Sequence, residues 1–466
     1  MPAMQEPRLN QGSVLSWILC LGALAVGARN FEQGGLGPDG PHYALIARGM
    51  AQTGEWLWMQ GTVPKFQPSA DYPHLGIWLL ALVFKIFPAA DWSARLVGIG
   101  FYLAFLGVFF RLLRLTLGVR PAVVGVLALW TMDRFSNYFS NVYLDPGLLF
   151  FGTSSLLLLY EATRRSSLAH AVFGGAAWAL AFLYKGMPAA AFFPALVFCL
   201  VCGPAENRRS GFRLAVGFFL AWALLLGSYL ALLQTAAPGL IAKYWERQWV
   251  TRFAHTKDWA LLFGWRYWGS VLRDCHWFLI FGFLALFWKR PRGLSWAPWI
   301  LLGCFSLLYA PLDRVGVQYW VLVLPWTAWI FAWAVAQDTQ WNPKPVLVFT
   351  RWVAIVLLIV VQFLPYPIHG KEGPEIQYLQ RRVRTGHANR VLLDFAPANS
   401  DFTRKDFYYW YANVEVTYPP EIPAAQRATL YILHHHTDER AALLSRAGWC
   451  EDERFDGRSF WLACAK

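Results

Sequence analysis

Long apolar runs separated by short polar loops make up most of this chain. The first run covers residues 13–28, and a longer, more polar segment follows at 29–92. A membrane-spanning helix needs about 20 mainly apolar residues, and ten further runs approach that length. These runs lie at 93–113, 121–135, 146–162, 168–184, 187–203, 213–234, 270–288, 294–311, 319–337 and 346–364. The pattern therefore predicts a polytopic α-helical membrane protein with about 11 transmembrane helices.

One apolar run is too short to cross a membrane. Residues 75–87 would form a helix about 20 Å long, whereas the hydrocarbon core of a bilayer is about 30 Å thick. We interpret this run as an interfacial helix, so that residues 29–92 form the first external loop. A second interfacial helix is predicted in the same loop, because apolar residues recur at helical spacing from Tyr43 to Met50.

Basic residues set the predicted topology. They gather in four short loops between apolar runs, at 111–120, 164–165, 208–213 and 289–292. Counting the spans alternately from a cytoplasmic N-terminus puts all four loops inside, as the positive-inside rule requires. If residues 75–87 formed a span, all four loops would lie outside. The 29–92 loop and the tail from about residue 366 are therefore predicted on the external face.

The polar tail after the last run predicts a small α/β domain. Its strand-like runs lie at 390–395, 414–418 and 429–434, and its helical patterns lie at 375–384, 406–412 and 438–447. We therefore divide the chain into a transmembrane domain at 1–365 and an extracytoplasmic α/β domain at 366–466. Cys450 and Cys464 fall in the second domain and can form a lasting disulfide if it lies outside the cytoplasm. The sequence leaves their pairing open.

Composition narrows the possible functions. Of the 466 residues, 57% are hydrophobic and 15% are charged, which excludes an ordinary soluble enzyme. The net charge of +13 comes from the basic loops, so membrane topology explains it better than nucleic-acid binding, and no nucleic-acid partner is expected. The seven cysteines and the isolated His42 and His74 show no metal-ligand spacing. We expect neither a metal ion nor a cofactor.

Three polar residues stand where predicted spans meet the external face, and each has two interpretations. Asp39, in a turn-rich stretch, is either a turn former or the base of a reaction at the membrane surface. Asp145, directly before Pro146, is a helix N-cap, a second carboxylate beside Asp39, or both. Lys185 either extends to the membrane interface or binds a phosphate as a point charge.

Basic and aromatic loops on the same predicted face supply further candidates. One loop contains Arg252 and His255, while Arg314 and Tyr319 lie between two later spans. Interfacial anchoring is the default interpretation of such a mixture. The same residues also offer cations to an anionic lipid headgroup on the face that carries the two acids.

Taken in order, these motifs resemble those of the GT-C glycosyltransferases. The most similar group contains the protein O-mannosyltransferases and the bacterial aminoarabinose transferases. Residues 39–48 resemble the family's Asp-x-x-x-Tyr-x-x-x-(Ala/Ser)-Arg motif, and residues 72–79 resemble its Pro-Pro-Leu-x-x-Trp-Leu segment. The other matching stretches are Leu144-Asp145, residues 181–186, and Gln318-Tyr319 with Pro325. The resemblance extends over about residues 13–340 and rests on the order and spacing of the motifs.

The resemblance implies a GT-C fold and a specific reaction. In this family the residue at the position of Asp39 is the proposed base. It deprotonates the acceptor, which attacks the anomeric carbon of a polyprenyl-phosphate sugar with inversion. Asp145 matches the second acidic motif, and cations would stabilise the departing phosphate. The expected substrate or phosphate contacts are Tyr43, Arg48, His74, Lys185, Arg252, His255, Arg314 and Tyr319.

The expected partners are membrane lipid, the lipid-linked donor, and an acceptor that is lipid A, another glycan or a protein. The expected location is the inner membrane of a bacterium, with the site and the C-terminal domain facing the periplasm.

This sequence departs from the family pattern at three places. Gly40 stands where an acidic residue is frequent, and Gln318 stands where Arg is usual. The Glu-Lys pair of the aminoarabinose transferases is replaced by Asp71 and Tyr72, so a phosphate-binding lysine is missing. These departures leave the sugar and the acceptor open, and they keep an inactive envelope-assembly scaffold as an alternative. A transporter or flippase of lipid-linked sugars is a further alternative. It predicts mid-span charges and two related halves, neither of which the sequence shows.

Overall fold

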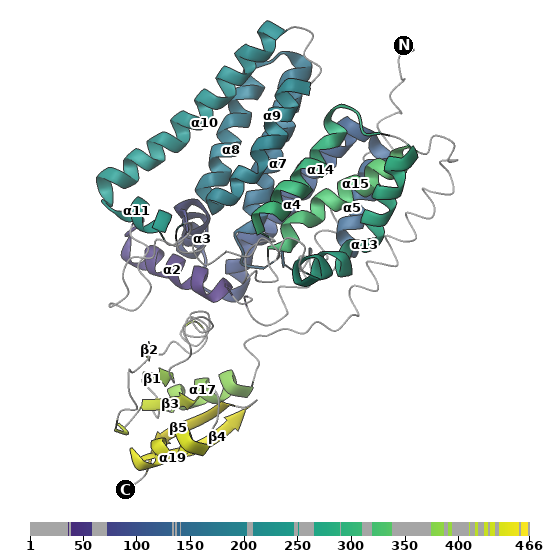
Figure 1. Cartoon of the computed structure of the whole chain (residues 1–466). Helices are drawn as coiled ribbons and strands as arrows, with labels where there is room; N and C mark the ends of the chain where they lie inside the picture. The colour runs from purple at the N-terminus through teal and green to yellow at the C-terminus, as the bar shows by residue number, and fades with distance from the viewer. Residues whose placement is uncertain are drawn as a thin grey trace.

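The computed structural model describes much of the helical region and a C-terminal sheet (Figure 1). The described residues are 36, 39–57, 72–132, 135, 138–139, 141–202, 208–246, 250, 265–288, 290–309, 319–337, 374–385, 390–393, 410, 415–417, 424–426, 429–433, 438–455 and 458–464. The predicted spans at 13–28 and 346–364 lie outside these residues, as do Arg252, His255 and Arg314.

Two helices come from the predicted first external loop. They are α2 (Gly40–Thr53) and α3 (His74–Ile86), and they pack against each other. Both apolar runs predicted as helices in this loop are therefore helical. The side of α2 that the pattern marks as apolar, from Tyr43 to Met50, is buried.

The predicted spans within the described residues also form helices. They are α4 (Asp91–Leu117), α5 (Val119–Thr131), α7 (Asp145–Arg165), α8 (Leu168–Lys185), η1 (Met187–Phe192), α9 (Phe193–Cys202), α10 (Arg208–Ala236), α11 (Leu240–Trp245), α13 (Trp265–Trp288), η4 (Gly293–Trp296), α14 (Ala297–Tyr309), η5 (Trp320–Val323) and α15 (Leu324–Ala336). α11 is the exception, because it follows α10 outside any predicted span.

By length and composition, three described helices are long and apolar enough to cross a membrane. They are Asp91–Leu117, Leu168–Lys185 and Gly211–Ala236, and shorter apolar helices of 10–17 residues accompany them. This number is smaller than the predicted count of spans. One reason is that several predicted spans begin with a 3₁₀ turn, as in η1 before α9 and η5 before α15. Such a start divides an apolar run into two pieces.

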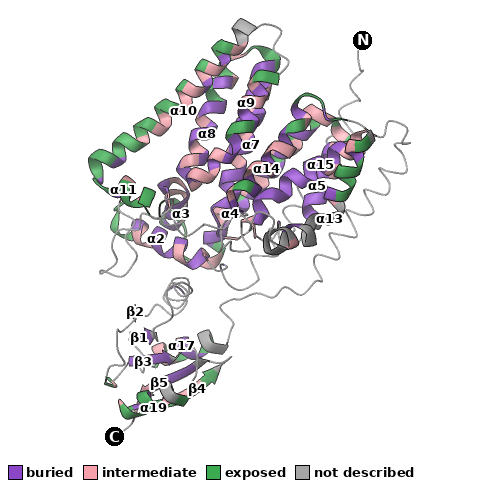
Figure 2. Ribbon diagram, in the orientation of Figure 1, coloured by how far each residue is buried: buried purple, intermediate pink, exposed green. Residues whose placement is uncertain are grey.

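The helices share one large core, and α10 covers part of its outside. Figure 2 shows buried residues concentrated along α4, α5, α7, α8 and α15, while α10 is exposed along much of its length. The exposed side chains of α10 include Phe212, Val216, Leu220 and Leu224, which recur every fourth residue. A continuous apolar stripe on the surface is unfavourable in water and favourable against lipid tails. It is consistent with a helix that faces a bilayer.

A mixed sheet forms in the tail. Its strands are β1 (Arg390–Leu393), β2 (Glu415–Thr417), β3 (Thr429–Leu433), β4 (Trp449–Phe455) and β5 (Arg458–Ala463), in the spatial order β2-β1-β3-β5-β4. β1 pairs in parallel with β2 and β3, whereas β5 pairs antiparallel with β3 and β4. The helices α17 (Pro374–Arg384) and α19 (Asp438–Arg446) accompany the sheet.

The first three strands and both of these helices lie where the sequence predicts them. The other two strands were not predicted, although they hold much of the core of the sheet through Trp449 and Trp461. A disulfide joins Cys450 on β4 to Cys464 directly after β5, with their Cα atoms 5.0 Å apart. The structure therefore forms the pairing that the sequence leaves open. Of the predicted helix at 406–412, only Trp410 belongs to the described residues.

Candidate active site

Asp39 lies at the N-cap position of α2. Pro41 begins the helix, and the backbone carbonyl of Asp39 accepts the first helical hydrogen bond from Tyr43 N, at 3.2 Å. Its carboxylate makes no capping hydrogen bond, so the side chain is not used to close the helix end. Asp39 is half-buried. Asp39 thus stands at the start of a helix that packs against α3.

A buried ion pair joins the ends of two neighbouring helices. Lys185 Nζ at the end of α8 donates to Asp145 Oδ1 at the start of α7. Their side chains are 9% and 2% exposed, so both charges are removed from water. The structure thus brings together two of the predicted candidates, 40 positions apart in the sequence.

The ion pair overturns two local interpretations. The N-cap of α7 is Leu144 and makes no side-chain capping bond, so the interpretation of Asp145 as an N-cap is wrong. Its carboxylate binds Lys185 instead, although the positive end of the helix dipole still favours its charge. Lys185 does not extend to the surface either, because Asp145 holds its amine in the interior.

Tyrosines surround the two acids. The hydroxyl of Tyr138 donates to Asp145 Oδ2 at 3.5 Å, and its ring stacks on Tyr143 with centroids 3.6 Å apart. Tyr43 meets Tyr72 edge-on at 5.0 Å. Lys185 Nζ lies 5.4 Å from the ring centroid of Tyr319, a predicted contact residue, which places a cation over an aromatic face.

The negative charges of the two acids affect the pKa of these phenols. Burial raises the pKa of Tyr138, and the negative charges of Asp145 and Asp39 raise it further. Burial likewise raises the pKa of Tyr43, with further contributions from Tyr72 and Asp39. Both phenols therefore remain neutral hydrogen-bond donors near two carboxylates. Tyr138 therefore contacts Asp145 directly, and the charge of Asp39 also acts on its phenol.

The sequence did not single out Tyr138 as a functional residue. A signal was present, since Tyr138 lies in the short polar stretch directly before Asp145, on the predicted external face. Its contact with Asp145 nevertheless depends on how the stretch folds back. The sequence predicts Tyr72 only as part of a motif. Its contact with Tyr43 is seen in the structure alone.

The ring of His74 forms two hydrogen bonds that connect separate elements of the fold. Its ring is buried, with Nε2 at 2.8 Å from the carbonyl of Leu57 and Nδ1 at 2.7 Å from the hydroxyl of Tyr229 on α10. Burial lowers the pKa of His74. A neutral ring that donates from Nε2 and accepts at Nδ1 satisfies both contacts. His74 thus links α3 to α10 and to the chain after α2.

Arg48 contacts a residue of the C-terminal region. Its guanidinium carbon is 5.3 Å from the ring centroid of Trp410, which belongs to the C-terminal region. Among the predicted contact residues that the structure describes, Tyr43, Lys185 and Tyr319 gather near the acids, whereas Arg48 and His74 face other partners.

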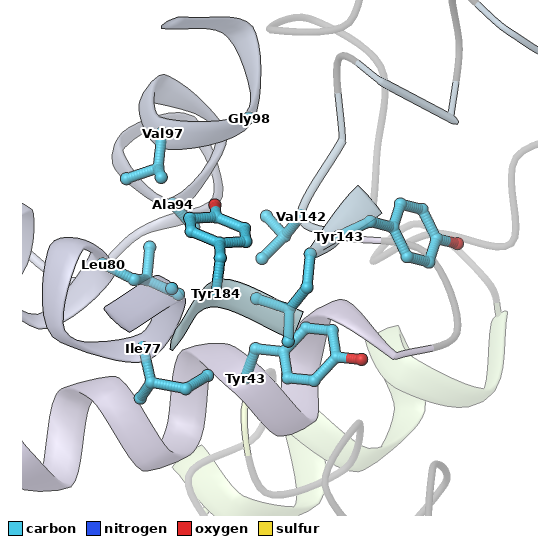
Figure 3. A pocket seen from close by; sticks show the side chains of 11 residues that line it. Tyr43, Ile77, Leu80, Ala94, Val97, Gly98, Val142, Tyr143 and Tyr184 are labelled. Carbon is cyan, nitrogen blue, oxygen red and sulfur yellow. The ribbon is translucent and has the colours of Figure 1, made fainter. Parts of the chain in front are cut away.

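An apolar pocket lies behind the tyrosines. Ile77, Leu80, Ala94 and Val97 help to line it, together with Tyr43 and Tyr184 (Figure 3). Its volume is about 10 Å³, which is room for one water molecule at most. In Figure 3 the hydroxyls of Tyr43 and Tyr143 point to one side, away from the apolar lining. The pocket is therefore an apolar support behind the site, too small for a sugar.

The Lys185-Gly186 hairpin depends on glycine. Gly186 has φ +80° and ψ −140°, a backbone conformation that side chains other than hydrogen rarely allow. A Cβ atom at this position would overlap the hydroxyl of Tyr244 on α11. Glycine therefore lets α8 end sharply at Lys185 and lets α11 approach the site closely.

The far end of α7 carries a second buried carboxylate, which pairs with two arginines. There Glu161 binds Arg111 of α4 at 3.0 Å and Arg165 at 2.7 Å. Asp145 and Glu161 are separated by about 24 Å along the helix. The basic side chains of two predicted cytoplasmic loops thus meet at one end of α7, and the candidate site lies at the other end.

Metal ligands do not cluster in the described part of the chain. Among the residues that the structure describes, no group of three or more His, Cys, Asp or Glu side chains is placed to hold a metal ion.

The chain is similar to a known family and to several solved structures. Residues 71–230 match the model of the family described as dolichyl-phosphate-mannose-protein mannosyltransferase. The crystal structure of ArnT from Cupriavidus metallidurans bound to undecaprenyl phosphate aligns over 97% of this chain and 98% of that chain, with 14% identity and a TM-score of 0.66.

The apo structure of the same ArnT aligns equally well. An oligosaccharyltransferase from Archaeoglobus fulgidus, AglB, was solved with an inhibitory peptide and a dolichol-phosphate. It aligns over 91% of this chain and 70% of that chain, with 13% identity and a TM-score of 0.54. No curated protein matched the chain by sequence.

Proposed function

The chain is a helical membrane protein with the fold of the GT-C glycosyltransferases, and we propose that it transfers a sugar from a polyprenyl-phosphate donor to an envelope acceptor. One observation carries the proposal. Asp145 and Lys185 form a buried ion pair beside Tyr138 and Tyr319, and the charge of Asp39 acts on Tyr43 and Tyr138 next to it. Such a site combines a base for the acceptor with a cation for a leaving phosphate.

Asp39 acts as the base in this proposal. It removes the proton from the attacking group of the acceptor, whose freed electron pair forms a bond to the anomeric carbon of the sugar. The bond between that carbon and the phosphate oxygen breaks, and polyprenyl phosphate leaves with its electron pair. Attack opposite the leaving group inverts the anomeric carbon. Asp39 suits this role because its carboxylate is half-buried and is not used in a helix cap.

Lys185 and Tyr319 receive the departing phosphate. Asp145 holds the lysine amine over the ring of Tyr319, so the cation is positioned before the donor arrives. Asp145 therefore acts by orienting Lys185, while Tyr138 links the ion pair to the side where Asp39 lies. The known neighbours support a lipid-linked donor, since ArnT was solved with undecaprenyl phosphate and AglB with a dolichol-phosphate.

We assign the site to the external face of a bacterial inner membrane. The pairing of Glu161 with two arginines at the other end of α7 supports this orientation, because basic residues favour the cytoplasmic side. The Cys450–Cys464 disulfide supports an external C-terminal region, because disulfides persist in oxidising compartments. The acceptor belongs to the envelope as lipid A, another glycan or a protein, and the reaction proceeds without a metal ion.

A reconstituted transfer assay tests the proposal. Purified chain in lipid vesicles receives polyprenyl-phosphate sugars and an envelope extract as acceptor, and the release of polyprenyl phosphate and the labelled product are measured. Wild type should release both, and Asp39→Asn should lose at least 100-fold in rate, the loss of a general base being worth about 10²–10⁴-fold. Glu55→Gln is the matched control, because this exposed carboxylate of the same loop lies after α2. Equal rates for wild type and Asp39→Asn would contradict the assignment of the base.

A further inference from the structure

A tryptophan of the C-terminal region lies within the core of the interfacial helices. Trp410 is only 8% exposed and belongs to the same buried cluster as Tyr43, Leu80 and Ala94. In the sequence, Trp410 lies between β1 and β2 of the sheet, more than 300 positions after these helices. Trp410 is therefore a point at which the C-terminal region enters the part of the molecule that carries the site.

Three different helices hold the indole. Its ring stacks on Phe84 of α3, with centroids 5.9 Å apart and planes inclined by 25°. Its Nε1–H donates to Asp91 Oδ1 at the start of α4, at 2.8 Å. The guanidinium carbon of Arg48 on α2 lies 5.3 Å from the ring centroid. One side chain thus connects α2, α3 and α4 through three different interactions.

The hydrogen bond to Asp91 is a specific feature of this position. Several other tryptophans of the described helices, such as Trp130, Trp326 and Trp329, bury their indole nitrogen without a hydrogen-bond partner. The core therefore accepts tryptophan for its volume alone. At Trp410 the indole meets a carboxylate, and a hydrogen bond to an ionised acceptor is about twice as strong as a neutral one.

The helices that Trp410 joins also support the candidate base. α2 begins directly after Asp39, and its buried face packs on α3. Ala94 and Val97 of α4 line the same apolar pocket as Tyr43 of α2 (Figure 3). A rotation or shift of α2 relative to α3 and α4 would therefore move Asp39 relative to Lys185, which lies on α8 and is held by Asp145 of α7.

We propose that Trp410 is a positioning residue, which docks the C-terminal region onto α2, α3 and α4 and thereby fixes Asp39 for proton removal. The inference rests on the proposed function for its catalytic consequence. It assigns the C-terminal region a role in the reaction, although Trp410 itself touches no reacting atom. A displacement of the base by about 1 Å lowers a rate by as much as 100-fold.

The test compares kcat, the KM of the donor and protease sensitivity in full-length variants. Trp410→Phe keeps a ring for Phe84 and Arg48 but removes the donor to Asp91, and we expect a kcat about three- to tenfold lower, as for a lost charge-assisted hydrogen bond. Trp410→Ala should lower kcat by about 10- to 100-fold. Both should leave the KM of the donor within about twofold, because Lys185 and Tyr319 lie on other elements.

Three companion variants make the test specific. Asp91→Ala should match Trp410→Phe, and the double variant should be no worse than either, because both remove the same hydrogen bond. Asp91→Asn retains an oxygen acceptor and should restore much of the kcat. Trp92→Phe is the control, since this half-exposed ring next to Asp91 packs on Phe87. It should behave like wild type.

Protease cleavage of the C-terminal region provides a readout that does not depend on transfer. Loss of docking in Trp410→Ala should speed this cleavage, with no change for Trp92→Phe. Unchanged kcat and cleavage in Trp410→Ala would overturn the inference, as would a loss of folded protein with normal kcat per folded molecule. If wild type transfers no sugar, the proposed function fails, and the cleavage rates alone then decide whether Trp410 docks this region.

Discussion

The buried Asp145–Lys185 ion pair allows the structural and catalytic roles of the site to be separated. We consider Lys185→Met, Asp145→Asn and the double variant that carries both changes. Lys185→Met leaves a carboxylate that is 2% exposed and that keeps, among the residues the structure describes, the 3.5 Å hydrogen bond from Tyr138. Asp145→Asn leaves the lysine cation in the interior without its anion.

The expected magnitude follows from the burial of both charges. Removing one partner of a buried ion pair costs about 3–5 kcal/mol, because the other charge stays desolvated. Replacing both partners by neutral groups of similar size is often close to neutral. Each single variant should therefore lose about 3–5 kcal/mol of unfolding free energy, and the double variant should lose less than either one.

The assay pairs thermal unfolding with donor turnover. One kcal/mol shifts the unfolding midpoint of a 150–250-residue protein by about 2–4 °C, so for this longer chain each single variant should shift it by roughly 3–10 °C. The double variant should recover most of this stability but no transfer, because it lacks the cation for the phosphate. Its activity should therefore stay at least about 100-fold below that of wild type.

A matched control lies at the other end of α7. Arg165→Met removes an arginine that is 58% exposed, while Glu161, which is 3% exposed, keeps its ion pair with Arg111, so the expected cost is only about 0–1 kcal/mol. It should change neither stability nor transfer appreciably. Single variants at Asp145 and Lys185 that lose under about 1 kcal/mol, or a double variant with normal transfer, would refute the reasoning.

Three further predictions follow from the surroundings of the site. Gly186→Ala should lower the unfolding midpoint and the rate of transfer, because the strained backbone alone costs about 1–3 kcal/mol of unfolding free energy. The control Gly100→Ala lies on an open helix surface and should be neutral or slightly stabilising. Because the pKa of His74 is lowered, its contribution to stability is complete above about pH 6.5 and is lost as the pH falls below that value; His74→Gln should flatten this acid dependence in thermal unfolding at pH 5–8. Dialysis against EDTA should leave the rate of transfer within about twofold, and a loss restored by added divalent ions would contradict the proposal that transfer needs no metal ion.

Much of the helical layout follows from the sequence because membrane helices are marked by one strong signal, the run of apolar residues. This signal depends only on neighbouring residues, so it predicts α2 and α3 in the first external loop as well as α4. It does not fix where a run breaks into a 3₁₀ turn and a helix, as it does at Met187, because that depends on packing against neighbours. The strand β4 was missed because its charged Cys450-to-Arg454 stretch forms the outer strand of the sheet, which lacks an apolar pattern.

The sequence predicted which residues belong to the candidate site better than it predicted which of them contact each other. Topology places Asp39, Asp145 and Lys185 on one face without stating which of them meet. The capping rule for Asp145 considers only adjacent residues, and it failed because a lysine from the next helix competes for the carboxylate. Arg48 matches a motif, yet its contact with Trp410 joins positions more than 350 residues apart, which no local pattern encodes.

The central claim is that this chain adds a sugar to an envelope molecule, with Asp39 as the base. The most direct measurement is mass spectrometry of envelope lipids and glycans from cells that lack the chain, complemented by wild type or by Asp39→Asn at equal membrane levels. We predict that a sugar modification disappears on deletion and returns with wild type but not with Asp39→Asn. Equal restoration by Asp39→Asn, or an envelope unchanged by deletion, would contradict the account.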